Sequence, residues 1–268
     1  VLLAVAVAAA AGMAVWLFTG REAAPAFVRT AQQNVLLITV DTLRADTLWS
    51  YGGAARTPNL DALAAGGIRF TFAHAHAVVT LPSHTSILTG RYPFEHGVRD
   101  NAGFRVADAV DTLSEAAHAA GFATAAFVGA FPLDRQFGPA QGFDIYDDLG
   151  GREVAGSEFA FAERRAEEVV SAARAWIGQQ QGRWLAWVHV FDAHAPYAPP
   201  RPFDQQSASD AYAGEVAYVD HALGPLLDLA RRGPRPTTVI VTADHGEGRG
   251  DHGEATHGVF AYESTLRV

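Results

Sequence analysis

A threonine that could act as a nucleophile lies where a helix is predicted to begin. Thr80 stands two residues before Pro82, whose fixed φ angle suits the first turn of a helix. We expect Thr80 and Leu81 to form the extended approach and residues 83–88 to form the helix. An anion bound beside Thr80 would meet unpaired N–H groups and the positive end of the helix dipole. The hydroxyl is therefore placed to attack a tetrahedral oxyanion centre, provided that a neighbouring group lowers its pKa.

A simpler interpretation is that Thr80 only caps the helix, and an isolated Thr-x-Pro sequence favours that role. The acidic and histidine residues along the rest of the chain favour the nucleophile over the cap. Asn101 also favours the nucleophile, because it closes a Gly-x-x-Asp-Asn turn after the helix and could donate its side-chain amide to a developing oxyanion.

Acidic and histidine residues directly follow three continuous apolar runs. Such runs are typical of strands buried on both faces of a parallel sheet, and they cover residues 34–40, 184–191 and 236–242. The residues that follow them are Asp41, then Asp192 and His194, then Asp244 and His245. Because the carboxyl ends of parallel strands meet at one edge of the sheet, we expect these side chains to converge there.

Carboxylates that lie close together raise each other's pKa, which is costly unless a cation lies among them. Oxygen and imidazole ligands without sulfur suit zinc, manganese, magnesium or calcium. A divalent cation bound by Asp41, Asp244 and His245 would stabilise the deprotonated hydroxyl of Thr80 and let it ionise near neutral pH. The residues therefore predict a metal site beside a nucleophile.

The composition bounds the fold and excludes several classes of function. The 268 residues are 49% hydrophobic and 18% charged, which fits one large α/β domain rather than a disordered tail. The net charge of −9 argues against nucleic-acid binding, which needs a basic surface. The chain has no cysteine, so disulfides, thiolate metal sites and cysteine nucleophiles are excluded.

The remaining elements alternate in type along the chain, as predicted from helix caps, glycines and apolar periodicity. Helices are expected at residues 57–66, 112–121, 157–177 and 210–229, strands at residues 68–73 and 123–128, and a long loop at residues 131–151. This alternation predicts an α/β fold, a three-layer αβα sandwich with a mostly parallel central sheet.

Several other polar residues are given structural roles. The helical residues Glu215 and Asp220 are expected to contact solvent or neighbouring elements, which is the usual fate of charges on helices. A structural hydrogen bond is favoured over metal ligation for His84. Glu254 is interpreted as a solvated loop residue.

The first residues differ from the rest of the chain. Residues 1–18 contain no charged residue and no proline, so residues 1–20 are predicted to be a transmembrane anchor or a signal segment. A buried core helix is the alternative. Residues 21–33 are interpreted as a linker and residues 34–268 as one folded domain. An anchor or a signal implies that this domain is membrane-anchored or exported and lies outside the cytoplasm.

Four separated motifs follow one another along the chain. They are the strand that ends in Asp41, the stretch from Thr80 to Asn101, the segment Asp192-Ala-His194-Ala-Pro-Tyr197 and the segment Asp244-His-Gly-Glu247. Together they resemble the sulfatase family, within the alkaline phosphatase superfamily, over nearly all of the chain after residue 33. The resemblance implies an alkaline phosphatase-like fold and a sulfatase-like catalytic domain over residues 34–268. We expect this domain to be truncated at its C-terminus, because relatives continue with a further strand and a smaller subdomain.

The chain departs from that family at the nucleophile. Sulfatases usually carry Cys-x-Pro-x-Arg with the cysteine oxidised to formylglycine, whereas Thr80 and His84 occupy the Cys and Arg positions here. Oxidation of a threonine would give a ketone rather than the required aldehyde, so the formylglycine mechanism is not expected. The Thr-x-Pro-x-His core is instead similar to that of nucleotide pyrophosphatase/phosphodiesterases, whose threonine is phosphorylated. The tandem aspartate of sulfatases is reduced to Asp41-Thr42, which removes a ligand suited to calcium.

The resemblance implies a metal site that is complete in this sequence. Its ligands would be Asp41, Thr80, Asp244 and His245. A second metal would need Asp192, His194 and His257, but relatives with two metals space the first pair as Asp-x-x-x-His. The one-metal and the two-metal arrangements are both kept as alternatives.

The resemblance also implies roles in substrate binding and proton transfer. His194 resembles a histidine that binds a substrate oxyanion or protonates the leaving group, and His257 resembles a histidine that binds substrate or a second metal. Asn101 and His84 are assigned to substrate binding, Asn101 because it resembles the asparagine that helps to bind the phosphoryl group.

The sequence predicts a metal-dependent hydrolase that cleaves phosphate, sulfate or phosphonate esters through Thr80. Zinc or manganese is favoured as the cation, with calcium and magnesium as alternatives. The substrate would be a small molecule or a lipid or glycan ester, and the N-terminal segment would contact the membrane. One alternative is a membrane-bound phosphoethanolamine or phosphoglycerol transferase with the same threonine, and another is a catalytically inactive metal-binding module.

Overall fold

The computed structural model describes residues 30, 32–148, 163–206 and 209–268. The chain divides into two units, Val1–Ala31 and Gln32–Val268. Nearly all of the first unit lies outside the described residues, and the predicted anchor or signal at residues 1–20 lies there entirely. Within the described ranges, no helix combines the length and the apolar character needed to cross a membrane.

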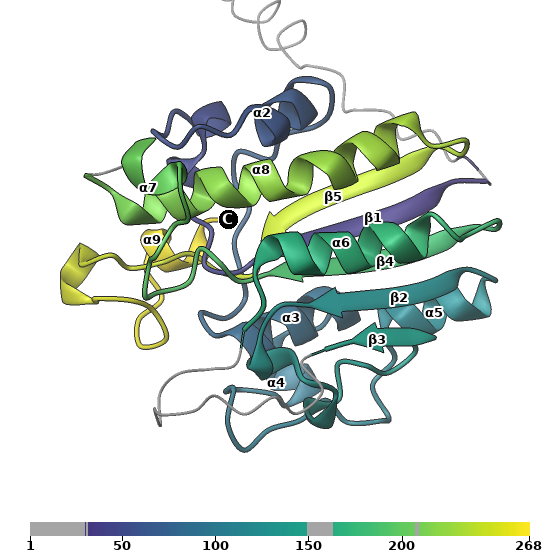
Figure 1. The fold of residues 1–268 in the computed structure, drawn as a ribbon. Coiled ribbons are helices and arrows are strands. Elements are labelled where there is room, and N and C mark those ends of the chain that lie inside the picture. Colours follow the sequence, from purple (N-terminus) through teal and green to yellow (C-terminus); the bar gives the residue numbers. More distant parts are fainter. Residues whose placement is uncertain (1–29, 31, 149–162, 207–208) are drawn as a thin grey trace, which may run out of the picture. The chain divides into compact units, whose positions relative to one another are not determined.

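The second unit is built on a five-stranded sheet in which every pairing is parallel (Figure 1). The strands are β1 Asn34–Val40, β2 Ala123–Val128, β3 Ile145–Asp147, β4 Trp184–Val190 and β5 Thr237–Ala243. Their order across the sheet is β3-β2-β4-β1-β5. The three strands that precede the acidic and histidine motifs are therefore neighbours, and their carboxyl ends meet at one edge, as predicted.

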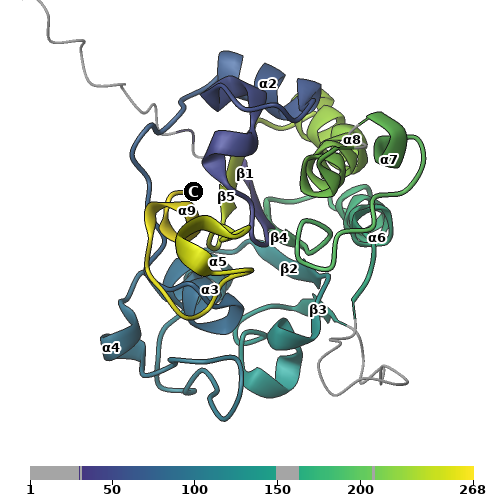
Figure 2. The same ribbon diagram turned by 90° about the vertical axis from the view of Figure 1, so that its left-hand side faces the viewer.

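Helices cover both faces of the sheet (Figure 2). One face carries α6 (Ala166–Ile177) and α8 (Ala211–Arg232), and the other carries α3 (Thr80–Thr89) and α5 (Leu113–Ala119). The other helices that the structure describes are α2 Pro58–Ala65, α4 Pro93–His96, α7 Phe203–Gln206, α9 Glu263–Leu266 and the short 3-10 helices Ala45–Thr47, Trp49–Tyr51, Phe131–Leu133, Arg135–Phe137 and Asp251–Gly253. The predicted three-layer αβα fold is confirmed.

The strands supply two separate cores, because successive side chains of a strand face opposite sides of the sheet. Leu36 packs in the core beneath α6 and α8. Leu37 of β1 and Trp187 of β4 pack instead with Leu81 of α3. Asp41 continues the alternation of Leu37, so this carboxylate lies at the strand end on the side of the sheet that α3 covers.

Two predictions about the approach to α3 were wrong. Residues 68–73 do not join the sheet, and Phe70 and Phe72 are 64% and 83% exposed. Among the described residues, no strand pairs with residues 68–73. The isolated antiparallel bridge between His74 and Arg267 lies next to them. Helix α3 begins at Thr80 itself, with Val79 extended before it. Pro82 is tolerated inside the first turn because N–H groups there have no acceptor within the helix.

Two longer predictions were only partly correct. The predicted loop at residues 131–151 contains β3, which pairs with β2 at the edge of the sheet, and residues 149–151 lie outside the described residues. The predicted helix at residues 157–177 is described from Ala166 onward, as α6, and residues 157–162 lie outside the described part.

The buried carboxylates of α8 hold neighbouring elements in place. Asp220 is fully buried and accepts the N–H of Leu60 at 2.8 Å, so it caps the start of α2. Glu215 is buried and accepts a backbone N–H from the loop after β4 at 2.8 Å. Both have the structural role that was predicted as one alternative. Glu254 was wrongly assigned to solvent, because it is 7% exposed and accepts the N–H of Val259 at 2.9 Å.

Candidate active site

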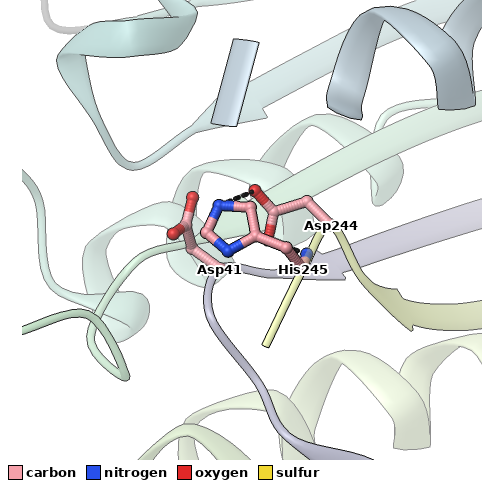
Figure 3. Close-up of side chains that lie close together, drawn as sticks. All are labelled: Asp41, Asp244 and His245. Atoms are coloured by element: carbon pink, nitrogen blue, oxygen red, sulfur yellow. Dashed lines mark hydrogen bonds and ion pairs between the residues drawn. The ribbon is translucent and has the colours of Figure 1, made fainter. Parts of the chain in front are cut away.

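Three predicted metal ligands meet at the carboxyl edge of the sheet (Figure 3). Asp41 directly follows β1, and Asp244 and His245 directly follow the adjacent β5. All three side chains are fully buried, and one ligand atom of each lies within 4.8 Å of the others. The parallel pairing of β1 with β5 brings the three residues together, as predicted.

Asp244 and His245 each keep one ligand atom free. Asp244 Oδ1 accepts the N–H of Thr42 at 3.2 Å and that of His245 at 2.8 Å, which leaves Oδ2 without a partner. His245 Nδ1 lies 2.9 Å from the carbonyl of Gly246 and donates to it, so Nε2 is unprotonated and also without a partner. These two acceptors face each other at 3.3 Å. Such a contact is unfavourable unless a proton or a cation lies between them.

Asp41 keeps one oxygen free in the same way. Gly129 donates its N–H to His189 Nδ1 at 3.3 Å, so the ring proton of His189 is on Nε2. That nitrogen lies 3.2 Å from Asp41 Oδ2 and donates to it, while Asp41 Oδ1 has no partner. Sequence reasoning missed His189, although it is a lone histidine in an apolar strand. Its register partner on β1 is Thr39, which shares the face of Asp41.

The electrostatics of the cluster favour a bound cation. Burial raises the pKa of Asp41 to about 7. Burial, and then the charge of Asp41, raises the pKa of Asp244 well above its usual range. Burial also lowers the pKa of His245 far below its usual range, so this imidazole is neutral. Two carboxylate oxygens and one imidazole nitrogen, each buried and free, form a donor set that fits a divalent cation.

Replacing His189 by phenylalanine is expected to weaken cation binding by about 10- to 100-fold, because Asp41 loses the donor that orients it. The measurement is a competition titration of the metal-free protein with zinc or manganese against a chelating dye. His96→Phe is the matched control, since His96 is a buried histidine whose ring bonds Ser86 at 3.0 Å, outside the cluster. Unchanged affinity in His189→Phe would show that His189 has no part in orienting Asp41.

Thr80 lies beside this cluster at the N-terminus of α3. Its side chain is 1% exposed and approaches the Asp41 carboxylate closely enough to lower the pKa of that group. Asn101 Oδ1 accepts the N–H of Leu81, the next helical residue, at 2.7 Å. That bond fixes the amide of Asn101 at the helix start, and its NH₂ end is the one left to face an anion. The structure thus brings Thr80, Asn101 and the ligand cluster together.

His84 is placed as a structural support of Thr80. Trp187 Nε1 donates to Thr39 Oγ1 at 2.9 Å, and Thr39 Oγ1 lies 3.0 Å from His84 Nε2, to which it donates. His84 Nδ1 then donates to the carbonyl of Thr80 at 2.8 Å. His84 is fully buried and both ring nitrogens are engaged, so this geometry supports the structural hydrogen bond rather than substrate binding.

Asp192 has a different environment from the one that a second metal would require. Its Oδ1 lies 3.2 Å from the guanidinium of Arg165, and its Oδ2 accepts the N–H of Ala166 at 2.9 Å, so it caps α6. Among the described residues, the group of candidate ligands does not include it. Arg165 itself was not singled out from the sequence. This arrangement favours the one-metal alternative.

His194 and His257 lie together beside the cluster. Their ring centroids are 5.0 Å apart, and the ring of His257 is 4.5 Å from that of His245. Burial lowers the pKa of His194 to about 4, and its Nδ1 donates to the carbonyl of Ala195 at 2.6 Å. A neutral imidazole bound in this way suits an acceptor better than the proton donor that was one of the two roles predicted for His194.

His257 is paired with a carboxylate that sequence reasoning left without a role. Its Nδ1 lies 3.1 Å from Glu247 Oε1, and Glu247 is fully buried. Burial lowers the pKa of His257, but Glu247 and then the charges of Asp41 and Asp244 together outweigh burial, and the pKa is raised above its ordinary value. The feature of the sequence that could have indicated a role for Glu247 is its place at the end of the Asp244-His-Gly-Glu247 segment.

Comparisons with known proteins bear on this site. The sulfatase family model matches residues 33–268. The N-acetylglucosamine-6-O-sulfatase of Bacteroides thetaiotaomicron is 32% identical over 131 residues, which cover 48% of this chain and 23% of that enzyme. Arylsulfatase A of Homo sapiens is 31% identical over 264 residues, which cover 80% of this chain and 52% of that enzyme. The chain thus spans about half or less of the length of these relatives.

Solved structures share the fold. The phosphonate monoester hydrolase of Agrobacterium radiobacter superposes with a TM-score of 0.72 at 21% identity, over 88% of this chain and 67% of that chain. The corresponding enzyme of Silicibacter pomeroyi gives a TM-score of 0.67 at 22% identity, over 88% and 67%. At these identities the likeness concerns the fold alone. Because the family model matches all but the first residues, the chain belongs to the sulfatase family.

Proposed function

We propose that this domain is a metal-dependent hydrolase of phosphate, phosphonate or sulfate esters, with Thr80 as its nucleophile. The observation that carries the proposal is the convergence of three free, buried acceptor atoms beside a threonine at a helix start. These atoms are Asp41 Oδ1, Asp244 Oδ2 and His245 Nε2. A purely structural cluster would satisfy such atoms with donors from the protein.

Asp41, Asp244 and His245 would hold the cation, with the Thr80 hydroxyl as a further ligand. When bound, a divalent cation supplies the positive charge that lowers the pKa of a hydroxyl and polarises an ester. Zinc or manganese suits this oxygen and nitrogen donor set best. Relatives that share the family are named as sulfatases, and members of the superfamily are metal-dependent, which supports an ester of an oxyanion as substrate.

The chain's own residues account for each step of the proposed reaction. Thr80 Oγ1 forms a bond to phosphorus or sulfur, and the bond to the leaving oxygen breaks. The amide of Asn101 and the helix start bind the oxygens of the transferred group. The His194 and His257 pair binds the substrate, and His257, with its carboxylate partner, supplies the proton to the leaving oxygen. Water then cleaves the covalent Thr80 ester and releases the transferred group as a phosphate, phosphonate or sulfate anion, with any substituent that is not the leaving group still attached.

Phosphorus esters are the preferred substrates in this proposal, because a threonine cannot become the aldehyde that formylglycine chemistry uses. The substrate would be a small molecule or a lipid or glycan ester. We further propose that the domain acts outside the cytoplasm, anchored or exported through its N-terminal segment. The inactive alternative is disfavoured, because the nucleophile and all three free ligand atoms are in place.

A hydrolysis panel on the full chain tests the proposed function. The substrates are an aryl phosphate monoester, an aryl phosphate diester, a phosphonate ester and an aryl sulfate, each assayed with zinc, manganese, magnesium or calcium. We expect turnover that requires the cation and is fastest for a phosphorus ester. Fastest turnover of the aryl sulfate, or turnover unaffected by a chelator, would overturn the threonine mechanism.

A further inference from the structure

Glu247 is a buried carboxylate outside the ligand cluster. It follows β5 by a few residues and is fully buried. Its main chain is held from both sides, because Gly246 donates its N–H to Thr265 at 2.8 Å and the Glu247 carbonyl accepts from the Arg44 guanidinium at 3.1 Å. The main chain around Glu247 is thus anchored by contacts of its own backbone groups. The carboxylate accepts one further backbone N–H and keeps the capacity to bind a second group.

The side chain of Glu247 points at His257. Glu247 Oε1 lies 3.1 Å from His257 Nδ1 and 3.2 Å from the N–H of Gly248. Burying an ionised carboxylate is costly unless it is paired. The ion pair described for Glu247 is the one with His257, which is itself largely buried, with 11% of its side chain exposed. The contact therefore defines which ring nitrogen of His257 faces the protein and which is left for a ligand.

A second residue lies close to the carboxylate. Tyr197, in the loop after β4, approaches Glu247, and both the Tyr197 hydroxyl and Glu247 Oε2 are buried. Burial, and then the charge of Glu247, raises the pKa of the Tyr197 hydroxyl, so it stays a neutral donor. Tyr197 belongs to the same motif as His194. Glu247 thus joins the loop that carries His194 to the loop that carries His257.

We propose that Glu247 is a positioning residue, which holds the His257 imidazole with Nδ1 on its carboxylate and Nε2 turned to the substrate. This inference rests on the proposed function, in which His257 serves the leaving group. Carboxylates that orient a functional imidazole in this way fix its tautomer and its ring plane. The role differs from that of Glu254, whose Oε1 accepts the N–H groups of Val259 and Phe260 and holds the loop backbone.

The test compares Glu247→Ala with Glu247→Gln on the full chain. Alanine removes the acceptor, whereas glutamine keeps the shape and an oxygen that can accept from His257. Histidine-selective ¹⁵N NMR of the metal-free protein reports which nitrogen of His257 carries the proton. Turnover kinetics on the best ester of the panel give kcat and KM, and a zinc or manganese titration gives the cation affinity.

We expect Glu247→Ala to lose the Nδ1–H signal of His257 and to lower kcat by about 10- to 100-fold at unchanged cation affinity. Glu247→Gln should keep the signal and recover most of kcat. Asp220→Asn is the control, because it alters a buried carboxylate that caps α2 and should lower stability without moving the His257 signal or kcat. Unchanged kcat and an unchanged His257 signal in Glu247→Ala would overturn the proposal.

The design separates this inference from the proposed function. If the full chain hydrolyses none of the esters, the proposed function fails, and the His257 signal of the metal-free variants alone decides whether Glu247 positions that ring. If Glu247→Ala does not fold, Glu247→Gln decides. Loss of the Nδ1–H signal in that variant would contradict the proposal, since its oxygen can still accept the bond.

Discussion

Thr80→Ala is expected to reduce ester turnover by about 10⁴-fold or more, the scale seen when a covalent nucleophile is removed. The variant lacks the oxygen that attacks the ester, while the helix start, Asn101 and the ligand cluster remain. Thr80→Ser keeps a hydroxyl at the same place and is expected to retain most of the activity. The measurement is single-turnover kinetics on the best substrate of the panel, with each variant loaded with the same cation.

A matched control lies in the same helix. Thr85 is also buried, and its hydroxyl donates to the carbonyl of Leu81 at 2.7 Å rather than facing the cluster. Thr85→Ala should therefore cost some stability and leave turnover unchanged. If Thr80→Ala kept its activity, the nucleophile would be a different group at the same sheet edge.

The covalent intermediate gives a second readout of the same prediction. Acid quenching during turnover should trap a phosphoryl or sulfuryl group on the peptide that contains Thr80, as detected by mass spectrometry. Adding an alcohol then distinguishes hydrolysis from transfer. Discharge by water supports the hydrolase, whereas faster discharge by the alcohol would assign the transferase that the sequence left as an alternative.

Asp244→Asn is expected to abolish measurable cation binding and, at the same time, to stabilise the metal-free protein. A direct ligand should cost more than the roughly 10- to 100-fold that orienting residues cost. Asparagine can keep the two backbone N–H bonds to Oδ1, and its amide can donate to His245 Nε2, which lies 3.3 Å from the oxygen that it replaces. At a pH at which Asp244 is ionised, an unfavourable contact of two acceptors becomes a hydrogen bond, worth about 1 kcal/mol.

Thermal unfolding with and without added zinc or manganese measures both effects. The wild-type protein should gain stability as the cation is added, because the cation binds only the folded state, and the variant should not. In a chelator, the variant should unfold at the higher temperature. A variant that was still stabilised by the cation would show that Asp244 is not a ligand, and a variant that was less stable without metal would contradict the expected hydrogen bond to His245.

The pH dependence of the metal-free protein extends this comparison. The pKa of Asp41 is raised from 3.8 to about 7, so between these values the folded state binds more protons than the unfolded state. Stability of the metal-free wild type should therefore fall as the pH rises from 3.8 to about 7. The fall should be smaller in Asp244→Asn, because the buried carboxyl group of Asp244, whose own pKa is raised by burial, is gone.

The sequence alone determined the fold class and the meeting of the predicted metal ligands. Short apolar runs rich in β-branched residues are typical of strands buried on both faces, and such strands in a parallel sheet bring the residues at their carboxyl ends to one edge. That reasoning placed Asp41 beside Asp244 and His245, and the structure confirms it. The reasoning needed no knowledge of distant contacts, because the polarity and the direction of the strands were enough.

Local sequence patterns were less informative where contacts with another element decide whether a strand forms or where a helix begins. Residues 68–73 alternate like a strand, but a strand exists only when a neighbour supplies its hydrogen bonds, and the sheet does not extend to them. The position of Pro82 did not determine that α3 begins at Thr80 either, because a proline is compatible with every position of the first helical turn. Leu81 and Leu88 of α3 pack in the core on one face of the sheet, a contact that the proline does not reveal.

The tertiary structure alone decided which polar groups pair around the site. His189 reaches Asp41 across 148 residues of sequence, and Asp192 turns away from His194 to Arg165 and the start of α6. Glu247 meets His257 only because the loop after β5 folds back on itself. The charged or polar side chains of these residues indicate that each needs a hydrogen-bond or ion-pair partner when it is buried, because a buried charge must be compensated. Which partner each one finds depends on the packing of the elements, and spacing along the chain does not encode that.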